Sequence, residues 1–140
     1  IAENKWASLN SMIQVGQMND LDSLANKSRM DIPDKNTTGI TSEVSTTLDT
    51  NVLMAAITVD ITHTYIGDLT VTLISPNNKK FPLHSRKGGS KDNIKKTFDI
   101  EFPKAINAKG TWKLHITDGA GSDTGHLNEW SLKLRNAVCE

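Results

Sequence analysis

The run Ile57-Thr58-Val59-Asp60-Ile61 alternates apolar and polar residues, and Leu69-Thr70-Val71-Thr72-Leu73 repeats the same pattern. Successive side chains of a β-strand point to opposite faces of the sheet, so this period of two is typical of strands buried on one face. The same parity of apolar residues occurs in five further segments, at residues 40–48, 81–83, 98–102, 112–116 and 130–134. The sequence therefore predicts at least seven strands.

The links between these segments are short, and they contain turn residues such as Ser75-Pro76-Asn77-Asn78 and Gly88-Gly89. Parallel strands need long crossover connections, which are usually helical, and no helical periodicity separates these strands. We therefore predict an all-β fold, an antiparallel β-sandwich of the jelly-roll type. The length of 140 residues fits a single domain, and the chain shows no internal repeat.

The first 30 residues lack this alternation. Their apolar residues, among them Trp6, Leu9, Leu21 and Leu24, have a mixed spacing that fits a short helix or an irregular strap better than a strand. We assign residues 1–30 to a linker or N-terminal extension that serves as a strap, and residues 31–140 to the sandwich.

The formal net charge of zero hides one basic stretch. Sixteen Lys and Arg residues balance sixteen Asp and Glu residues, and no run approaches the roughly 18 apolar residues of a spanning helix. We therefore expect neither nucleic acid nor a membrane as a partner. Residues 79–96 nevertheless hold seven basic residues against Asp92 alone, a net charge of +6. We interpret this stretch as a solvated loop; a sulfated glycan, a phosphate-bearing ligand or an acidic neighbouring domain are the alternatives.

The sequence offers no catalytic constellation. It has no G-x-S-x-G motif, and its four histidines lie too far apart to form a paired metal-ligand motif. His63 continues the parity of the apolar residues before it, which predicts a buried side chain, whereas His115 alternates outward from its apolar neighbours. The only cysteine is Cys139, so the domain has no internal disulfide. We predict no catalytic residue in this chain.

Three aspartates in loops are the candidate binding residues. Asp68 lies just before a predicted strand, and Asp118 and Asp123 bracket a glycine-rich loop. Calcium takes six to eight oxygen ligands, and carboxylates together with the carbonyls of such a loop can supply them. The alternative, equally weighted, is that these aspartates are turn residues whose carboxylates bind backbone N–H groups two or three positions along the chain.

Five groups of residues occur in an order and spacing found in a known family. They are Ile32-Pro33-Asp34 with Gly39-Ile40, His63-Thr64-Tyr65-Ile66-Gly67-Asp68-Leu69, Leu73-Ile74-Ser75-Pro76, Gly110-Thr111-Trp112-Lys113-Leu114 with Asp118, and Thr124-Gly125-His126-Leu127-Asn128-Glu129-Trp130-Ser131-Leu132. Together they resemble the P domain, or homo B domain, of proprotein-convertase and kexin-like subtilisin serine proteases, in its bacterial type. The resemblance covers residues from about 31 to 135.

This resemblance implies a noncatalytic accessory domain of a secreted, extracellular endopeptidase. Such a domain follows a subtilisin-like serine protease catalytic domain, or in bacteria sometimes a metalloprotease, stabilises it and aids its folding. The implied partners are the catalytic domain of the same chain and a protein substrate. The family motif around Gly67-Asp68-Leu69 and the later Asp118 and Asp123 make a structural calcium site the expectation for these three aspartates.

A binding module that recognises a matrix protein or a polysaccharide for the attached protease is the alternative function. Exposed planar aromatic residues would favour it, because sugars stack on such rings. Tyr65 is the one plausible candidate, since Trp112 and Trp130 share the parity of core residues. A free-standing enzyme is the third and least favoured function.

Overall fold

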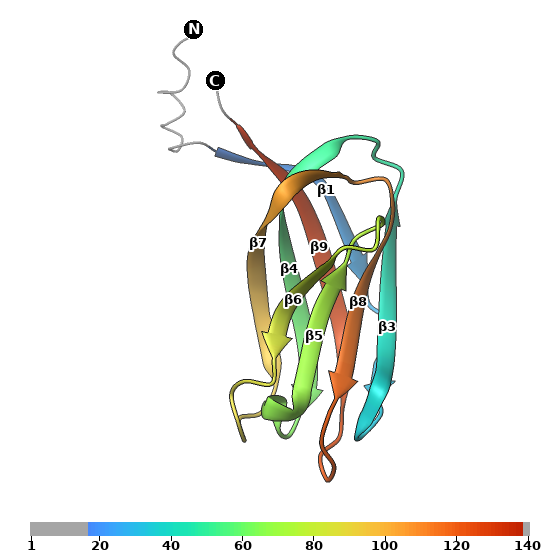
Figure 1. The fold of residues 1–140 in the computed structure, drawn as a ribbon, viewed down its shortest axis with the longest axis vertical. Coiled ribbons are helices and arrows are strands. Elements are labelled where there is room, and N and C mark those ends of the chain that lie inside the picture. The colour runs from blue at the N-terminus through green and yellow to red at the C-terminus, as the bar shows by residue number, and fades with distance from the viewer. Residues whose placement is uncertain (1–16, 139–140) are drawn as a thin grey trace, which may run out of the picture.

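Residues 17–138 are described by the computed structural model, and they form two antiparallel sheets packed face to face (Figure 1). Apart from a 3₁₀ turn at Ile66–Asp68, the regular elements of these residues are all strands. The strands are β1 (Gln17–Asn26), β2 (Met30–Ile32), β3 (Asn36–Thr46), β4 (Asn51–His63), β5 (Leu69–Ile74), β6 (Lys80–Ser85), β7 (Ile94–Asn107), β8 (Gly110–Asp118) and β9 (Gly125–Val138). Within this part of the chain, no helix has the length and apolar character needed to span a bilayer.

The strand order identifies the sandwich as a jelly roll. One sheet has the order β1-β9-β4-β7, and β2 also pairs with β9; the other has the order β3-β8-β5-β6. Every pairing within the two sheets is antiparallel. From β2 onward, each link except the β5–β6 hairpin crosses from one sheet to the other, which is the double-sheet winding expected of this architecture. The predicted fold class is confirmed.

The seven predicted strands are all present, as β3 to β9, but the prediction for the leader is wrong over residues 17–26. These residues form β1, which pairs antiparallel with β9 along its whole length. The register shifts between Asp20 and Asp22, and this irregularity changes the parity of the apolar residues Leu21 and Leu24. The bulge in this edge strand therefore appears in the sequence as a mixed spacing of the apolar residues. The rest of the predicted leader strap, residues 1–16, lies outside the described residues.

Alternating residues of both sheets meet in one core. In β5 and β8 every second side chain is buried, as the period of two predicts. Trp112 and Trp130 are 0% and 1% exposed, and each indole N–H has an acceptor, at 2.9 Å on the carbonyl of Ala108 and at 2.8 Å on Oγ of Ser42. Since buried polar groups cost free energy unless they are hydrogen-bonded, both rings are well accommodated. The prediction that these tryptophans belong to the core is confirmed.

Candidate functional site

One end of the sandwich, at the bottom of Figure 1, gathers segments that are far apart in the sequence. β4 ends at His63, the 3₁₀ turn ends at Asp68, and β8 ends at Asp118. The loop from β8 to β9 carries Asp123. β4 and β8 belong to opposite sheets, so this end joins the two layers of the fold. We call these four residues the end cluster.

A buried histidine–aspartate pair lies at the centre of the end cluster. Nε2 of His63 is 2.9 Å from Oδ2 of Asp118, and both side chains are fully buried. The backbone N–H of Tyr65 donates to Nδ1 of His63 at 3.0 Å, so Nδ1 carries no proton and Nε2–H donates to the carboxylate. The burial of His63 confirms the prediction made from its parity.

This pair is not arranged for catalysis. A histidine that acts as general base in a hydrolase binds a carboxylate with one nitrogen and leaves the other for the nucleophile. In His63 the second nitrogen accepts the N–H of Tyr65, and the ring is 0% exposed. Neither nitrogen is left to take a proton from a substrate or nucleophile. The pair instead has a structural role, because its hydrogen bond joins the two sheets.

Asp118 also holds the start of the β8–β9 loop. Its Oδ1 accepts the backbone N–H of Ala120, two positions along the chain, at 3.1 Å. This is the turn interaction weighed as the alternative to calcium binding. Each carboxylate oxygen of Asp118 therefore already accepts one hydrogen bond, from Ala120 or from His63.

Asp68 differs from Asp118 because its carboxylate has no hydrogen-bond donor among the described residues. The residue is only 5% exposed. Burial raises the pKa of the Asp68 carboxyl above its ordinary value of 3.8, and the charges of Asp118 and Asp123 raise it further, while Arg86 offsets part of the rise. The main chain of Asp68 is fixed nonetheless, since its carbonyl accepts the N–H of Gly119 at 2.8 Å. A buried, unpartnered carboxylate is thus held against the β8–β9 loop.

The raised pKa of Asp68 predicts a loss of stability as pH rises. The folded carboxyl keeps its proton at pH values where the unfolded chain has lost it, so the folded protein binds more protons. The free energy of unfolding therefore falls as pH increases from the ordinary pKa of 3.8 through the raised value. We expect Asp68→Asn to flatten this decline in urea unfolding measured across the acidic range in EDTA. The exposed control Asp92→Asn should keep the wild-type slope, and an equal slope for Asp68→Asn would contradict the prediction.

Asp123 completes the end cluster from the β8–β9 loop. Its Oδ1 accepts the hydroxyl of Thr64 at 2.8 Å. The three predicted aspartates are close enough for Asp118 and Asp123 to act electrostatically on Asp68. No group of three or more His, Cys, Asp or Glu side chains within residues 17–138 has the geometry to hold a metal ion. The structure gathers the aspartates at one end but does not arrange them as a finished ligand set.

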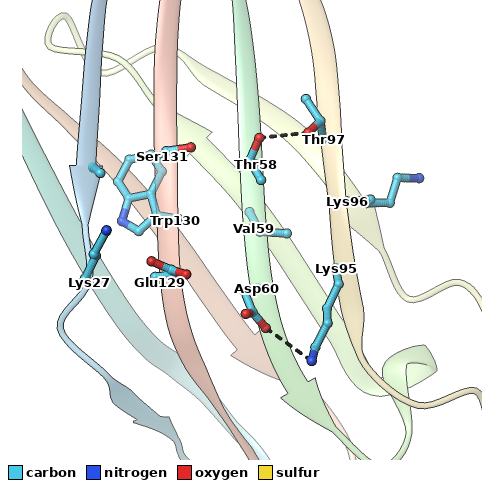
Figure 2. Close-up of a pocket in the computed structure, with 11 residues that line it drawn as sticks. Lys27, Thr58, Val59, Asp60, Lys95, Lys96, Thr97, Glu129, Trp130 and Ser131 are labelled. Atoms are coloured by element: carbon cyan, nitrogen blue, oxygen red, sulfur yellow. Dashed lines mark hydrogen bonds and ion pairs between the residues drawn. The ribbon is translucent and has the colours of Figure 1, made fainter.

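A separate open pocket of about 540 Å³ lies on the outer face of the β1-β9-β4-β7 sheet. Figure 2 shows its polar lining, with Thr58 bonded to Thr97 at 2.8 Å and Lys95 paired with Asp60 at 3.8 Å. Trp130 lines the pocket but is 1% exposed, so its ring offers no surface on which a sugar could stack. Tyr65, which is 38% exposed, is not among the lining residues. This face does not favour polysaccharide binding.

Comparison with known sequences agrees with the resemblance noted in the motifs. The family model of the proprotein convertase P-domain matches residues 53–134, which is more than half of the chain. The chain belongs to this family. The matched region contains all four residues of the end cluster, together with strands β5 to β8. The end cluster therefore belongs to the part of the chain that carries the family assignment.

The relatives of this P domain are bacterial proteases, and the chain spans a quarter or less of the two described next. It is 34% identical over 112 residues to leupeptin-inactivating enzyme 1 of Streptomyces exfoliatus, covering 79% of this chain and 25% of that protein. It is 41% identical over 87 residues to the calcium-dependent protease of Trichormus variabilis, covering 56% of this chain and 13% of that protein.

A solved structure shows the same fold. The P domain superposes on a serine protease of Aeromonas sobria, crystallised in complex with a chaperone, with a TM-score of 0.72 and 18% sequence identity. The similarity covers 94% of this chain and 29% of the other. At this level of identity the similarity establishes the sandwich fold and no more.

Proposed function

We propose that this P domain is the noncatalytic C-terminal accessory domain of a secreted, extracellular subtilisin-like serine endopeptidase. The observation that carries the proposal is the P-domain match, together with the small share of each protease relative that the chain spans. The engaged nitrogens of His63 agree with a domain that performs no peptide chemistry of its own. Its role is to stabilise the catalytic domain and to aid its folding.

Stabilisation by a tethered domain has a direct thermodynamic basis. Any partner that binds the folded but not the unfolded state raises the free energy of unfolding by mass action. A covalent link between two domains keeps their effective concentration in the millimolar range for a short flexible linker. An effective concentration one hundred times the Kd between this P domain and its catalytic domain therefore raises the free energy of unfolding by about 2.7 kcal/mol.

Removal of the P domain from the complete protease is expected to lower the Tm of the catalytic domain by about 5–10 °C. The yield of active enzyme after refolding should fall as well. Differential scanning calorimetry and an activity assay on the complete and truncated proteases measure both effects. The coding sequence upstream of Ile1 should supply a Ser-His-Asp triad for these experiments. An unchanged Tm together with an unchanged refolding yield would contradict the accessory role.

A structural calcium ion held by Asp68, Asp118 and Asp123 forms part of the proposal. The residues fit such an ion in one respect: Asp68 is buried and its carboxylate has no hydrogen-bond donor among residues 17–138, so a cation would compensate its charge. The β8–β9 loop can supply carbonyl oxygens, which calcium needs to reach six to eight ligands. The name of the Trichormus variabilis relative, a calcium-dependent protease, supports the same choice of ion.

Calcium is expected to raise the unfolding temperature of the P domain relative to EDTA. At a calcium concentration of about one hundred times Kd, binding raises the free energy of unfolding by about 2.7 kcal/mol. Asp123→Asn should abolish this gain, and Asp68→Asn should do the same. Asp92→Asn, which changes an exposed carboxylate in the loop between β6 and β7, is the matched control and should keep the gain in unfolding temperature. A wild-type protein with the same Tm in calcium and in EDTA would contradict the calcium site.

A further inference from the structure

Two pockets lie along one side of the sandwich, between the edges of its two sheets. β6 is the last strand of one sheet and β7 is the last strand of the other, and both lie on the same side of the molecule (Figure 1). A pocket of about 720 Å³ opens between residues 82–85 of β6 and 94–98 of β7. A second pocket of about 380 Å³ lies farther along the same two strands, beside Phe81 and residues 103–106. We call the two pockets together the edge groove.

The lining of the edge groove combines an apolar floor with a lysine rim. Ile66, Leu83 and Phe98 line the larger pocket, and all three are partly buried residues packed on the core. Phe81 has the same position in the smaller pocket. The charged residues of the lining are all lysines: Lys79, Lys87, Lys91, Lys95, Lys96 and Lys104.

No carboxylate is found among the residues that line either pocket of the edge groove. In a protein whose basic and acidic residues balance at sixteen each, this is a marked segregation of charge. Lys95 is paired with Asp60 at 3.8 Å, which offsets part of its charge, whereas Nζ of Lys96 lies 4.7 Å from the ring centre of Phe98 on the groove floor. Positive potential is therefore focused on an apolar strip, which attracts a partner that is both acidic and apolar.

An alternative role for lysines on an edge strand is to prevent strands of other molecules from pairing with that edge. That role accounts for Lys95 and Lys96, which belong to β7, but not for Lys87 and Lys91, which belong to the β6–β7 loop. This loop is fixed on the 3₁₀ turn: Ile66 N–H donates to the carbonyl of Lys91 at 3.0 Å, and Gly67 N–H donates to that of Gly89 at 2.9 Å. The loop lysines are thus presented to the groove by an ordered backbone.

We infer that the edge groove binds an extended acidic peptide segment in which Asp and Glu alternate with apolar residues. In an extended chain the two kinds of side chain point to opposite faces, so apolar residues can meet the floor while acidic residues turn toward the lysines. Pro82 and Pro103 interrupt the two strand edges and lack N–H groups, so side chains carry the recognition rather than a continuous added strand. A sulfated glycan would meet the same lysines but would leave the apolar floor unused. This inference goes beyond the accessory role and does not depend on it.

The inference is tested with the 140-residue chain and a labelled peptide of about eight residues, enough to follow β6 at about 3.3 Å per residue. The peptide alternates Asp and Glu with Leu and Val, and fluorescence anisotropy gives its Kd. We expect Lys87→Gln/Lys91→Gln to weaken binding about five- to tenfold, because an exposed ion pair contributes up to about fivefold. Lys27→Gln/Lys133→Gln removes the same charge from exposed positions outside the groove and should leave the Kd unchanged.

Two further peptides and one glycan distinguish the occupants of the edge groove. A peptide with Gln and Asn in place of the acidic residues, and one with Ser in place of the apolar residues, should each bind at least tenfold more weakly. Equal weakening by the two double variants would overturn the inference, since it would reflect net charge alone. Displacement of the peptide by heparin oligosaccharide at lower concentration than by the unlabelled peptide would also overturn it and assign the lysines to a glycan.

Discussion

Asp118→Ala is expected to lower the free energy of unfolding by about 3–5 kcal/mol, because its carboxylate accepts two hydrogen bonds and each bond to a charged group contributes about 1.5–3 kcal/mol. The substitution leaves the buried Nε2–H of His63 without its acceptor at 2.9 Å. It also removes the acceptor of the Ala120 N–H, which holds the start of the β8–β9 loop. Urea unfolding followed by tryptophan fluorescence measures the change, since Trp112 and Trp130 are both in the core.

Two controls separate the pairing with His63 from a general effect of removing aspartate. In EDTA, Asp123→Ala deletes a half-buried carboxylate whose bond is to the hydroxyl of Thr64, and it should cost no more than about 1.5 kcal/mol. A double-mutant cycle with His63→Leu should show strong coupling, because the second substitution removes the group that the first leaves unsatisfied. A cost below about 1 kcal/mol for Asp118→Ala, or additive effects in the cycle, would contradict the buried pair.

The fold could be predicted from local patterns because the sandwich is built of strands with one face in the core. The parity of residues 57–61 placed His63 inside, and the parity of residues 112–116 placed Trp112 inside. β1 escaped prediction because its register shift between Asp20 and Asp22 breaks the alternation that identifies a strand. β2 has only three residues, too few to show any period. Both missed strands lie along β9, which was found.

The candidate site could be predicted only as separate residues. Asp68, Asp118 and Asp123 were identified by their positions beside turns and in a glycine-rich loop, and the structure gathers them at one end. The hydrogen bond from His63 to Asp118 joins residues that are 55 positions apart, and no local pattern indicates which buried histidine meets which carboxylate. That contact depends on the pairing order of the strands, which is set by the whole fold.

Several residues of the motifs that resemble the family make structural contacts at the same end of the sandwich. His63 and Asp118 join β4 to β8, and Asp68 anchors Gly119 through its carbonyl. Gly39 adopts a φ of +67°, and a Cβ there would lie 2.1 Å from the carbonyl oxygen of Ile116 in β8. The bond from His63 to Asp118 joins the two sheets at this end, and Gly39 lets β3 approach β8 closely within one sheet. Their order in the sequence therefore follows the path of the chain through the strands at this end of the jelly roll, and it also identifies the family.

Gly125→Ala is expected to destabilise the domain by about 3 kcal/mol, the upper part of the usual range for overpacking. A Cβ at this position would lie 2.1 Å from the carbonyl oxygen of Thr62 and 2.9 Å from Cα of His63, so backbone atoms of β4 would have to move. Gly125 pairs with His63 in β4 and with Ile32 in β2, which confines it on both sides. The same displacement would disturb the bond from His63 to Asp118.

Gly121→Ala is the matched control for this substitution in the neighbouring loop. A Cβ at Gly121 would have its nearest neighbour at 3.7 Å, the side chain of Lys35, which is ordinary contact at a flexible group. We therefore expect its effect on the free energy of unfolding to stay within about 0.5 kcal/mol, as for most surface substitutions. Thermal or urea unfolding of the two variants in parallel gives the difference. Equal stability of Gly125→Ala and Gly121→Ala would contradict the close approach of β9 to β4, and with it the arrangement that brings His63 to Asp118.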